Sequence, residues 1–418
     1  MLLGEAKFLW AFSLSSPQKV IIFLQLIPWS LDHGIFVDEN ISKVYNGIMR
    51  KKGMEKSVIL SAIAVAALIV FIVVVQSNKW NHIAVEISAD SNSNELTKYT
   101  VNYLDVFDTS TDITGFTNTQ DEFNDEAAII KEQLTYYNNL YDIYNDYDGM
   151  NNIKTINDNA GVAPVEVDSE IIELIKFGQD MYDLTDGTVN IAMGSVLRIW
   201  HEYREYGINN PEKASLPDLA ELQAAAEHTD INNVIVDEKA STVYLADKDM
   251  SLDVGSIAKG YAVQQVLEYC KAQGMNNILF SVGGNIAGLG SRGDGTNFKI
   301  AIQNPDLESS EPYIEKLSIT DGQCVVSSGD YQRFYQVDGK RYCHIINPDT
   351  LYPSETFAGV SILTDDSAKA DALSTALFNM TLEEGQDFIN SQDGVEAMWV
   401  YHDGTVVYSE HFEDSVIE

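Results

Sequence analysis

Cysteine is scarce in this chain. It occurs three times in 418 residues, at Cys270, Cys324 and Cys343, and no two cysteines are separated by only two residues. A disulfide framework and a zinc site of the CxxC type are therefore excluded. Basic residues are also few: Lys and Arg number 26 against 63 Asp and Glu, so the net charge is −37. A surface this acidic repels phosphate backbones, and we expect no binding to nucleic acid.

One long hydrophobic run lies near the N-terminus. Residues 58–75 read VILSAIAVAALIVFIVVV, which is 18 apolar or small residues without a charge. A helix of that length can span a bilayer. The run is longer than the apolar part of a secretion signal, and the VVVQSNKW that ends it contains no Ala-x-Ala cleavage site. We therefore expect a retained transmembrane anchor over residues 58–76, in preference to a cleaved signal.

The charges beside this run predict its orientation. The basic segment RKKGMEK precedes it, so residues 1–57 should lie in the cytoplasm and the chain after the span outside it. Residues 1–76 hold 7 of the 26 basic and 5 of the 63 acidic residues, which leaves 19 basic and 58 acidic residues and a net charge of −39 for the remainder. The expected location is the cell membrane, with a single span and the large C-terminal part on the extracytoplasmic side.

A second apolar stretch, residues 20–31, is broken by Pro28 and is short for a membrane span. It is either an interfacial segment or part of a stretch that is not translated. Translation from Met49 rather than Met1 is the simpler interpretation, and Met54 is a further possible start. We assign no function to residues 1–48.

The exported part reads as a tether followed by one domain. Residues 77–98 are polar and rich in Ser and Asn, which is typical of a tether. Residues 99–418 alternate strand and helix patterns without a repeat or a second linker. We expect hairpins over residues 233–245, 331–346 and 396–408, and helices over residues 126–147, 169–182 and 256–270 and from residue 368. Hairpins mixed with helices predict an α+β fold.

The first block that can carry chemistry is SLDVGSIAKGYAV, residues 251–263. A strand end meets a glycine and a helix start, and such a junction presents free backbone N–H groups to an anion. Lys259 adds a positive charge one turn into the helix, and Asp253 can accept a hydrogen bond. The block matches neither standard phosphate loop. An ordinary strand–helix turn with a solvated lysine explains the same pattern.

Two more blocks follow buried strands. In ILFSVGGN, residues 278–285, the strand is followed by two glycines that allow a tight turn or the close approach of a ligand. VVSSGDY, residues 325–331, leads through a hairpin to His344 beside a polar turn. A histidine there suits a general base or a phosphate contact. A plain turn and a structural histidine are the alternatives.

The fourth block is KADALSTALF, residues 369–378. Asp371, Ser374 and Thr375 stand at i, i+3 and i+4 and therefore share one helix face. A carboxylate and hydroxyls are hard oxygen ligands that suit Mg²⁺. The same spacing is also common in helices that bind no metal.

In their order and in their residue patterns, the four blocks resemble the ApbE family, the FAD:protein FMN transferases, over residues 105–404. DVGSIAKGYAV is similar to the family's D-[LV]-G-[GAS]-I-A-K-G-Y-A, and SVGGN to its strand-GG-[DN] block. SSGDYQRFYQVDGKRYCHIINP is similar to the block that ends in H-I-[ILM]-[DN]-P, and KADALSTALF to A-D-[AG]-L-[ST]-T-A. Weaker similarity lies at residues 107–109 and 186–190. The resemblance implies a single large ApbE-like domain of mixed sheets and helices.

The resemblance also implies a role for individual residues. The residues that would contact the flavin or the rest of FAD are Phe107, Thr188, Val189, Asn190, Asp253, Lys259 and Ile345. Mg²⁺ would be held by the carbonyl of Ser256 with Asp371 and Thr375, and Ser374 is a neighbour of these ligands.

The implied reaction is a Mg²⁺-dependent phosphoryl transfer. A Thr or Ser hydroxyl of an exported or membrane redox protein attacks the FMN-side phosphorus of FAD, and AMP leaves. Lys259 would stabilise the leaving side, and His344 or Asp330 would take the hydroxyl proton. The family's acceptor signal is roughly [ST]-G-A-[ST], which this chain lacks, so we expect a separate acceptor protein.

Two residues depart from the family's H-I-[IL]-D-P-x-T-G-Y-P pattern. Asn347 replaces the commoner Asp and removes a charge, and Leu351 replaces a Gly that can adopt positive φ. Both leave room for a divergent or hydrolytic member. The alternatives are therefore an FAD pyrophosphatase, in which water replaces the hydroxyl, and a non-catalytic flavin-binding surface protein.

Overall fold

The computed structural model describes residues 96–418. The expected anchor at residues 58–76 and nearly all of the expected tether lie outside the described residues. Within residues 96–418, no helix combines the length and the apolar character that crossing a bilayer requires.

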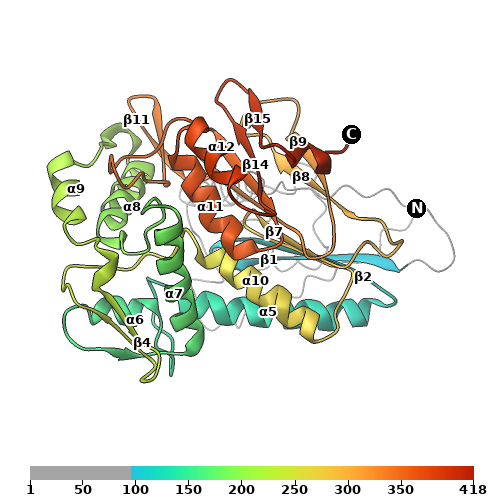
Figure 1. Cartoon of the computed structure of the whole chain (residues 1–418), viewed down its shortest axis with the longest axis horizontal. Helices are drawn as coiled ribbons and strands as arrows, with labels where there is room; N and C mark the ends of the chain where they lie inside the picture. The colour runs from blue at the N-terminus through green and yellow to red at the C-terminus, as the bar shows by residue number, and fades with distance from the viewer. Residues whose placement is uncertain (1–95) are drawn as a thin grey trace, which may run out of the picture. The chain divides into compact units, whose positions relative to one another are not determined.

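An antiparallel sheet of eight strands organises the described residues (Figure 1). Its order is β1-β2-β6-β7-β10-β13-β14-β15. The strands are β1 (Thr97–Val106), β2 (Thr109–Thr117), β6 (Ile278–Val282), β7 (Asn285–Leu289), β10 (Cys324–Gly329), β13 (Gly359–Thr364), β14 (Glu396–Val400) and β15 (Val406–Tyr408). Because β7 pairs with β10, Asn285 lies opposite Val326, and two of the sequence blocks become neighbours.

Apolar side chains bury both faces of this sheet. On one face lie α5 (Gln120–Tyr141), α10 (Ala258–Ala272) and α11 (Ser367–Asn379), whose apolar residues pack on β6, β7, β10 and β13. On the other face, the hairpin of β8 (Phe298–Gln303) and β9 (Tyr313–Ile319) packs against Leu279 and Ile286. Burial on both sides explains why strands such as ILFSV and GVSILT are almost continuously apolar.

Two smaller groups of elements adjoin the sheet and its helices. One has β3 (Val165–Glu166), β4 (Val234–Asp237), β5 (Thr242–Leu245), α6 (Ile153–Asp158) and α7 (Ser169–Leu184). The other has α8 (Gly194–Asn209), α9 (Leu219–Ala226), β11 (Phe334–Val337) and β12 (Lys340–Cys343), which share an apolar cluster around Trp200 and Tyr335 (Figure 1). The remaining elements are α12 (Leu382–Asn390) and the short helices η1 (Pro211–Lys213), η2 (Ile231–Asn233) and η3 (Phe412–Ser415).

The α+β class predicted from the sequence is confirmed, and all three expected hairpins are present. Helix α5 begins at Gln120, earlier than expected, because the Thr119 side chain caps the amide of Glu122. It ends at Tyr141 because Asp142 turns the chain by accepting the next amides. The sequence reading did not anticipate α8, α9, β8 or β9.

The two departures in the loop after His344 are accommodated by local contacts. Asn347 Oδ1 accepts from the amides of Asp349 at 2.9 Å and Thr350 at 3.0 Å, as an Asp would. Its Nδ2 also donates to the Asn379 carbonyl at 3.2 Å, which an Asp cannot do. Leu351 has a positive φ of 61° and is buried, and its carbonyl accepts from Trp200 Nε1 at 2.8 Å.

The strain at Leu351 gives a stability prediction. Replacement by Gly or Ala removes a buried side chain, at a cost of about 2–5 kcal/mol. Only Gly also relieves the left-handed backbone, which costs a non-glycine residue roughly 1–2 kcal/mol. We therefore expect Leu351→Ala to be less stable than Leu351→Gly by about 1 kcal/mol.

Urea unfolding of the full-length chain would measure this difference. Leu222 is a matched control, because it is fully buried in α9. There the usual helical order applies, with Ala more stable than Gly. An Ala variant at Leu351 that is more stable than the Gly variant would contradict the prediction.

Candidate functional site

The start of α10 lies directly against α11. The Gly260 amide donates to Asp371 Oδ2 at 2.7 Å, and Lys259 Nζ lies 3.9 Å from Asp371 Oδ1. A Cβ on Gly260 would lie 2.3 Å from the Ser367 carbonyl oxygen and 2.4 Å from Asp371 Cβ. Only glycine permits this approach. The first and fourth sequence blocks are thus joined by a charge-assisted hydrogen bond.

Three residues of these blocks carry oxygen atoms that could hold a magnesium ion. Gly260 is the third residue of α10, so its amide has no carbonyl partner within the helix, and Asp371 satisfies it. Ser256 lies just before the start of α10, in the same sequence block. The carboxylate of Asp371 and the hydroxyl of Thr375, which is partly exposed, complete a set of hard ligands.

Ser374 has a different position from the other expected metal residues. Its hydroxyl is buried and donates to the Asp371 carbonyl at 2.8 Å, and it lies 2.7 Å from Ser328 Oγ. These bonds tie α11 to β10, so they join the fourth block to the third. Ser374 therefore holds the helix that presents Asp371.

The segment of Phe107, an expected flavin contact, meets the paired glycines of the second block. Phe107 has a φ of 52°, and its amide donates to Asn138 Oδ1 at 2.7 Å. Its ring packs between two apolar clusters. The Gly283 amide donates to the Ser110 carbonyl at 3.0 Å, and a Cβ at Gly283 would lie 2.5 Å from Thr109 Oγ1.

The segment of Thr188, Val189 and Asn190 lies beside Asp253. The Asp253 amide donates to the Ile191 carbonyl at 2.8 Å, which aligns the two segments. Val189 is buried, and the Asn190 side chain holds the local turn. Its Oδ1 accepts from the Ala192 amide at 2.8 Å and its Nδ2 donates to the Thr229 carbonyl at 3.0 Å.

His344 is held as a neutral imidazole. Its Nδ1 lies 3.2 Å from the Arg333 carbonyl, and since a carbonyl only accepts, Nδ1 carries the proton and Nε2 keeps its lone pair. Desolvation, followed by the charges of Arg333, Arg204 and Lys259, lowers the pKa of His344 to about 3. A free Nε2 lone pair is what a general base requires. The neighbouring Ile345 is buried under β10 and β13.

Asp330 lies among other partners. Its carboxylate is 3.5 Å from Arg341 Nη1 and 3.8 Å from His402 Nδ1, and its amide donates to the Ala358 carbonyl at 3.1 Å. Burial raises the pKa of Asp330, against the opposing charges of His402 and Arg341. Among the described residues, no hydrogen bond or ion pair connects it to Lys259, Asp371 or His344.

Sequence reasoning missed four residues near Asp253: Tyr144, His201, Arg204 and Arg333. The Asp253 carboxylate accepts from the Gly255 amide at 2.8 Å. Burial raises its pKa, against this hydrogen bond and the charges of His201, Arg204 and Arg333. The signal available in the sequence was the spacing of His201 and Arg204 in α8, three residues apart and therefore on neighbouring positions of one helix face.

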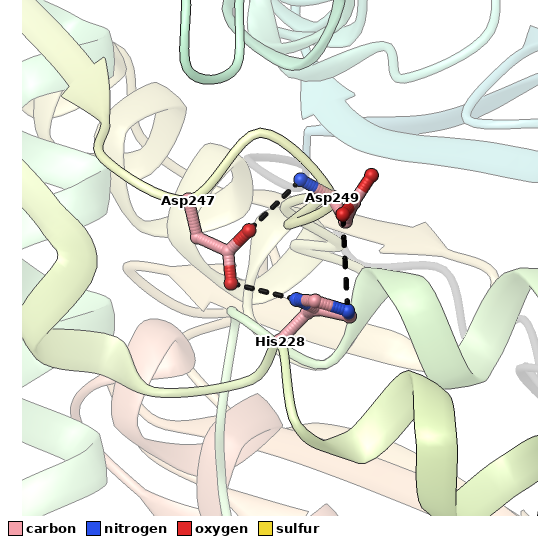
Figure 2. A group of neighbouring side chains, drawn as sticks. All are labelled: His228, Asp247 and Asp249. Atoms are coloured by element: carbon pink, nitrogen blue, oxygen red, sulfur yellow. Dashed lines mark hydrogen bonds and ion pairs between the residues drawn. The ribbon is translucent and has the colours of Figure 1, made fainter.

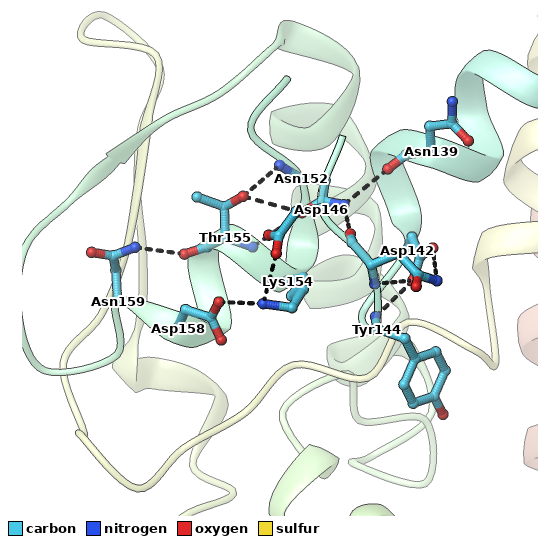
Figure 3. Close-up of polar contacts among 10 residues, drawn as sticks. Asn139, Asp142, Tyr144, Asp146, Asn152, Lys154, Thr155, Asp158 and Asn159 are labelled. Atoms are coloured by element: carbon cyan, nitrogen blue, oxygen red, sulfur yellow. Dashed lines mark hydrogen bonds and ion pairs between the residues drawn. The ribbon is translucent and has the colours of Figure 1, made fainter. Parts of the chain in front are cut away.

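A polar network fixes the loop that carries Tyr144 (Figure 3). Asp142 Oδ1 accepts from the Tyr144 amide at 2.6 Å. Asn152 Nδ2 donates to the carbonyls of Asn139 at 3.1 Å and Asn145 at 2.8 Å, which ties the end of α5 to the start of α6. The exposed Tyr144 ring is thereby held 5.4 Å from the His201 ring.

A separate cluster of His228, Asp247 and Asp249 offers metal-type side chains whose ligand atoms lie within 4.8 Å of one another (Figure 2). His228 Nδ1 is 2.7 Å from Asp247 Oδ2, and Asp247 Oδ1 accepts from the Asp249 amide at 2.9 Å. The ammonium of Lys248 contacts Asp249. These bonds satisfy the cluster internally and hold the turn that leads into residues 251–253.

Comparisons with known proteins agree with this geometry. The profile of the ApbE family matches residues 97–399. The FAD:protein FMN transferase of Klebsiella pneumoniae (strain 342) is 31% identical over 258 residues, which are 62% of this chain and 77% of that protein. The FAD:protein FMN transferase of Treponema pallidum (strain Nichols) is 32% identical over 278 residues, which are 63% of this chain and 74% of that protein.

Solved structures give the same result for the fold. The crystal structure of the ApbE protein from Thermotoga maritima aligns with a TM-score of 0.67 and 27% identity, and covers 77% of this chain and 100% of that chain. The family expected from the four sequence blocks is thus confirmed by sequence and by fold. The chain belongs to the ApbE family.

Proposed function

We propose that this protein is an FAD:protein FMN transferase. The observation that carries the proposal is the junction of α10 and α11, where Lys259 and the Gly260 amide meet Asp371. The names of the curated relatives support the same activity. In the proposed reaction, the acceptor's Thr or Ser oxygen forms a bond to the FMN-side phosphorus of FAD. The bond from that phosphorus to the bridging oxygen breaks, and AMP leaves with the oxygen.

The three oxygens of Ser256, Asp371 and Thr375 would hold Mg²⁺. A bound magnesium ion supplies positive charge that offsets the charge of a diphosphate. Lys259 adds a fixed ammonium on the same side of Asp371, and the Gly260 amide keeps the Asp371 carboxylate in one orientation. Most of the catalysis expected of these residues is positioning and charge stabilisation.

His344 would take the proton of the acceptor hydroxyl at Nε2, since Nδ1 is committed to the Arg333 carbonyl. Without substrate, burial and then the nearby cations keep the pKa of His344 low, so the imidazole is a weak base. A diphosphate bound among these cations would cancel their repulsion and raise the basicity of His344. The base would thus become effective when FAD is present. We favour His344 over Asp330, which is engaged by Arg341 and His402.

A transfer assay tests the proposed function. The full-length chain in detergent would be incubated with FAD, Mg²⁺ and an acceptor domain that carries an [ST]-G-A-[ST] site. We expect the acceptor to gain the mass of one FMN with an equal amount of AMP, and Asp371→Asn to reduce the rate by about a hundredfold or more because a metal ligand loses its charge. Mass spectrometry and AMP quantification would measure both products.

The control for this assay is Asp365→Asn, because Asp365 is an exposed carboxylate just before α11 and should leave the rate unchanged. AMP release without a modified acceptor would favour an FAD pyrophosphatase. Tight FAD binding with neither product would favour a non-catalytic flavin-binding protein. Full activity in Asp371→Asn, or in the presence of a strong chelator, would exclude the proposed metal site.

The pKa of His344 gives a pH prediction. The ring has a pKa of about 3 in the folded protein against an ordinary 6.5, so the unfolded chain binds one more proton between these pH values. Its contribution to the free energy of unfolding is complete above pH 6.5 and is lost as the pH falls toward 3. We expect acidification from pH 7.5 to 5 to cost the wild type about 1 kcal/mol more than His344→Gln, after allowance for partial exposure of the ring.

Urea unfolding of both proteins at the two pH values would measure this difference. His411→Gln is the control, since His411 is exposed on the surface. A wild type and a His344→Gln variant with the same pH dependence would show that His344 titrates normally.

We further propose that residues 58–76 anchor the protein and that residues 99–418 act outside the cytoplasm on an exported or membrane redox protein. The uncharged run of 18 residues and the basic segment before it support this placement. A reporter enzyme that is active only outside the cytoplasm, fused after residue 98, should be active. Replacing the basic residues of RKKGMEK by Gln should lower that activity, and a reporter inactive in the unchanged chain would contradict the topology.

A further inference from the structure

Three cations come from separate segments to the neighbourhood of His344, and two of these segments, α8 and the chain around β11, pack together around Trp200 and Tyr335. Arg204 comes from α8, Arg333 from the turn before β11, and Lys259 from the start of α10. Burial lowers the pKa of His344, and all three cations lower it further. Burial and then Arg333 also lower the pKa of Arg204. Two guanidinium groups that repel one another cost stability unless an anion joins them.

Arg204 is held in place by a neighbour on its own helix. Its Nη2 lies 2.8 Å from His201 Nδ1, and because a guanidinium only donates, Nδ1 must accept. The other ring nitrogen, Nε2, is 3.2 Å from Glu205 Oε1. His201 is therefore a relay between Glu205 and Arg204, and it positions a partly buried guanidinium at the side of Asp253.

Arg333 is positioned through its backbone. Its carbonyl accepts from His344 Nδ1, so the residue proposed to orient the base also brings a guanidinium to the same place. Within residues 96–418, neither Arg204 nor Arg333 has a carboxylate oxygen within 4.0 Å, whereas Arg341 and Lys259 each do. In a domain with so large an excess of acidic residues, two neighbouring arginines without such a partner suit an external anion.

The aromatic pair next to Arg204 indicates which part of a ligand lies there. Tyr144 is 56% exposed, and its ring centroid is 5.4 Å from that of His201. Exposed aromatic rings of this kind favour stacking with a nucleobase. His344, which is bonded to the Arg333 carbonyl and not to the Tyr144 and His201 pair, belongs with the attacking hydroxyl. A phosphate bound by Arg204 therefore lies on the adenosine side of the reacting bond.

We propose that Arg204 and Arg333 clamp the adenosine-side phosphate of FAD and stabilise AMP as the leaving group. When the phosphoanhydride bond breaks, the bridging oxygen and its electron pair stay with AMP, whose phosphate gains a negative charge. Two guanidinium groups neutralise that charge without any proton transfer. This role rests on the proposed function. It adds Arg204 and Arg333 to Lys259 as residues that stabilise the leaving group.

Calorimetric titration of AMP into the full-length chain tests the clamp without requiring turnover. We expect Arg204→Gln and Arg333→Gln each to raise the Kd for AMP by about tenfold or more, as for loss of a charged hydrogen bond. Binding of riboflavin, which has no phosphate, should stay unchanged. Arg198→Gln is the matched control, because Arg198 is an exposed arginine of the same helix and is not among the groups that act on Asp253.

Thermal unfolding would verify that each variant is folded. Arg204→Lys is a second variant, which retains the positive charge but lacks the planar guanidinium that can donate two parallel hydrogen bonds. We expect it to recover only part of the AMP affinity. Unchanged AMP binding in both Gln variants would overturn the clamp. Weaker binding of FMN together with unchanged binding of AMP would also overturn it, because the arginines would then contact the FMN-side phosphate.

The outcomes separate this inference from the proposed function. If the wild type binds AMP through both arginines but transfers no FMN to any acceptor, the clamp stands and the transferase proposal fails. If the wild type transfers FMN and both Gln variants bind AMP normally, the transferase proposal stands and the clamp fails.

Discussion

The contact between Gly260 and Asp371 is the constraint on which the site depends. It satisfies an amide in the first turn of α10 that has no partner within the helix, orients a buried carboxylate and sets the separation of α10 and α11. A side chain at position 260 would collide with the backbone of α11. Because both helices also pack on the central sheet, this separation is fixed from two sides. The packing of α10 on α11 and the orientation of the Asp371 carboxylate are therefore determined by the same few atoms.

Charge is distributed unevenly in this protein, and the distribution has a functional meaning. A net charge of −37 favours solubility but repels a diphosphate from most of the surface. The cations near His344 reverse this locally, and they come from α8, α10 and the turn before β11. Such a site attracts an anion only at short range, since salt screens exposed charges beyond about 8–10 Å. A diphosphate should therefore bind at this site and not elsewhere on the acidic surface.

Two features show how the fold tolerates departures from the family pattern. Asn347 keeps the turn of an Asp and adds a bond to Asn379. Leu351 keeps the left-handed backbone of a Gly because burial beside Trp200 stabilises it. In both cases, the backbone conformation is preserved while the side chain changes. The loop after His344 therefore gives no structural reason to favour hydrolysis over transfer.

The local sequence by itself determined much of this protein. Turn signals and apolar periodicity predicted the α+β class, three hairpins and the helices around Lys259 and Asp371, because these depend on neighbouring residues. The residue patterns of four sequence blocks identified the family. What only the tertiary structure decided is which side chains meet. Arg204 and Arg333 reach Asp253 from segments far apart in the chain, and Asp330 is drawn to Arg341 and His402 instead of His344. Such contacts arise from the packing of whole elements, and no local pattern encodes them.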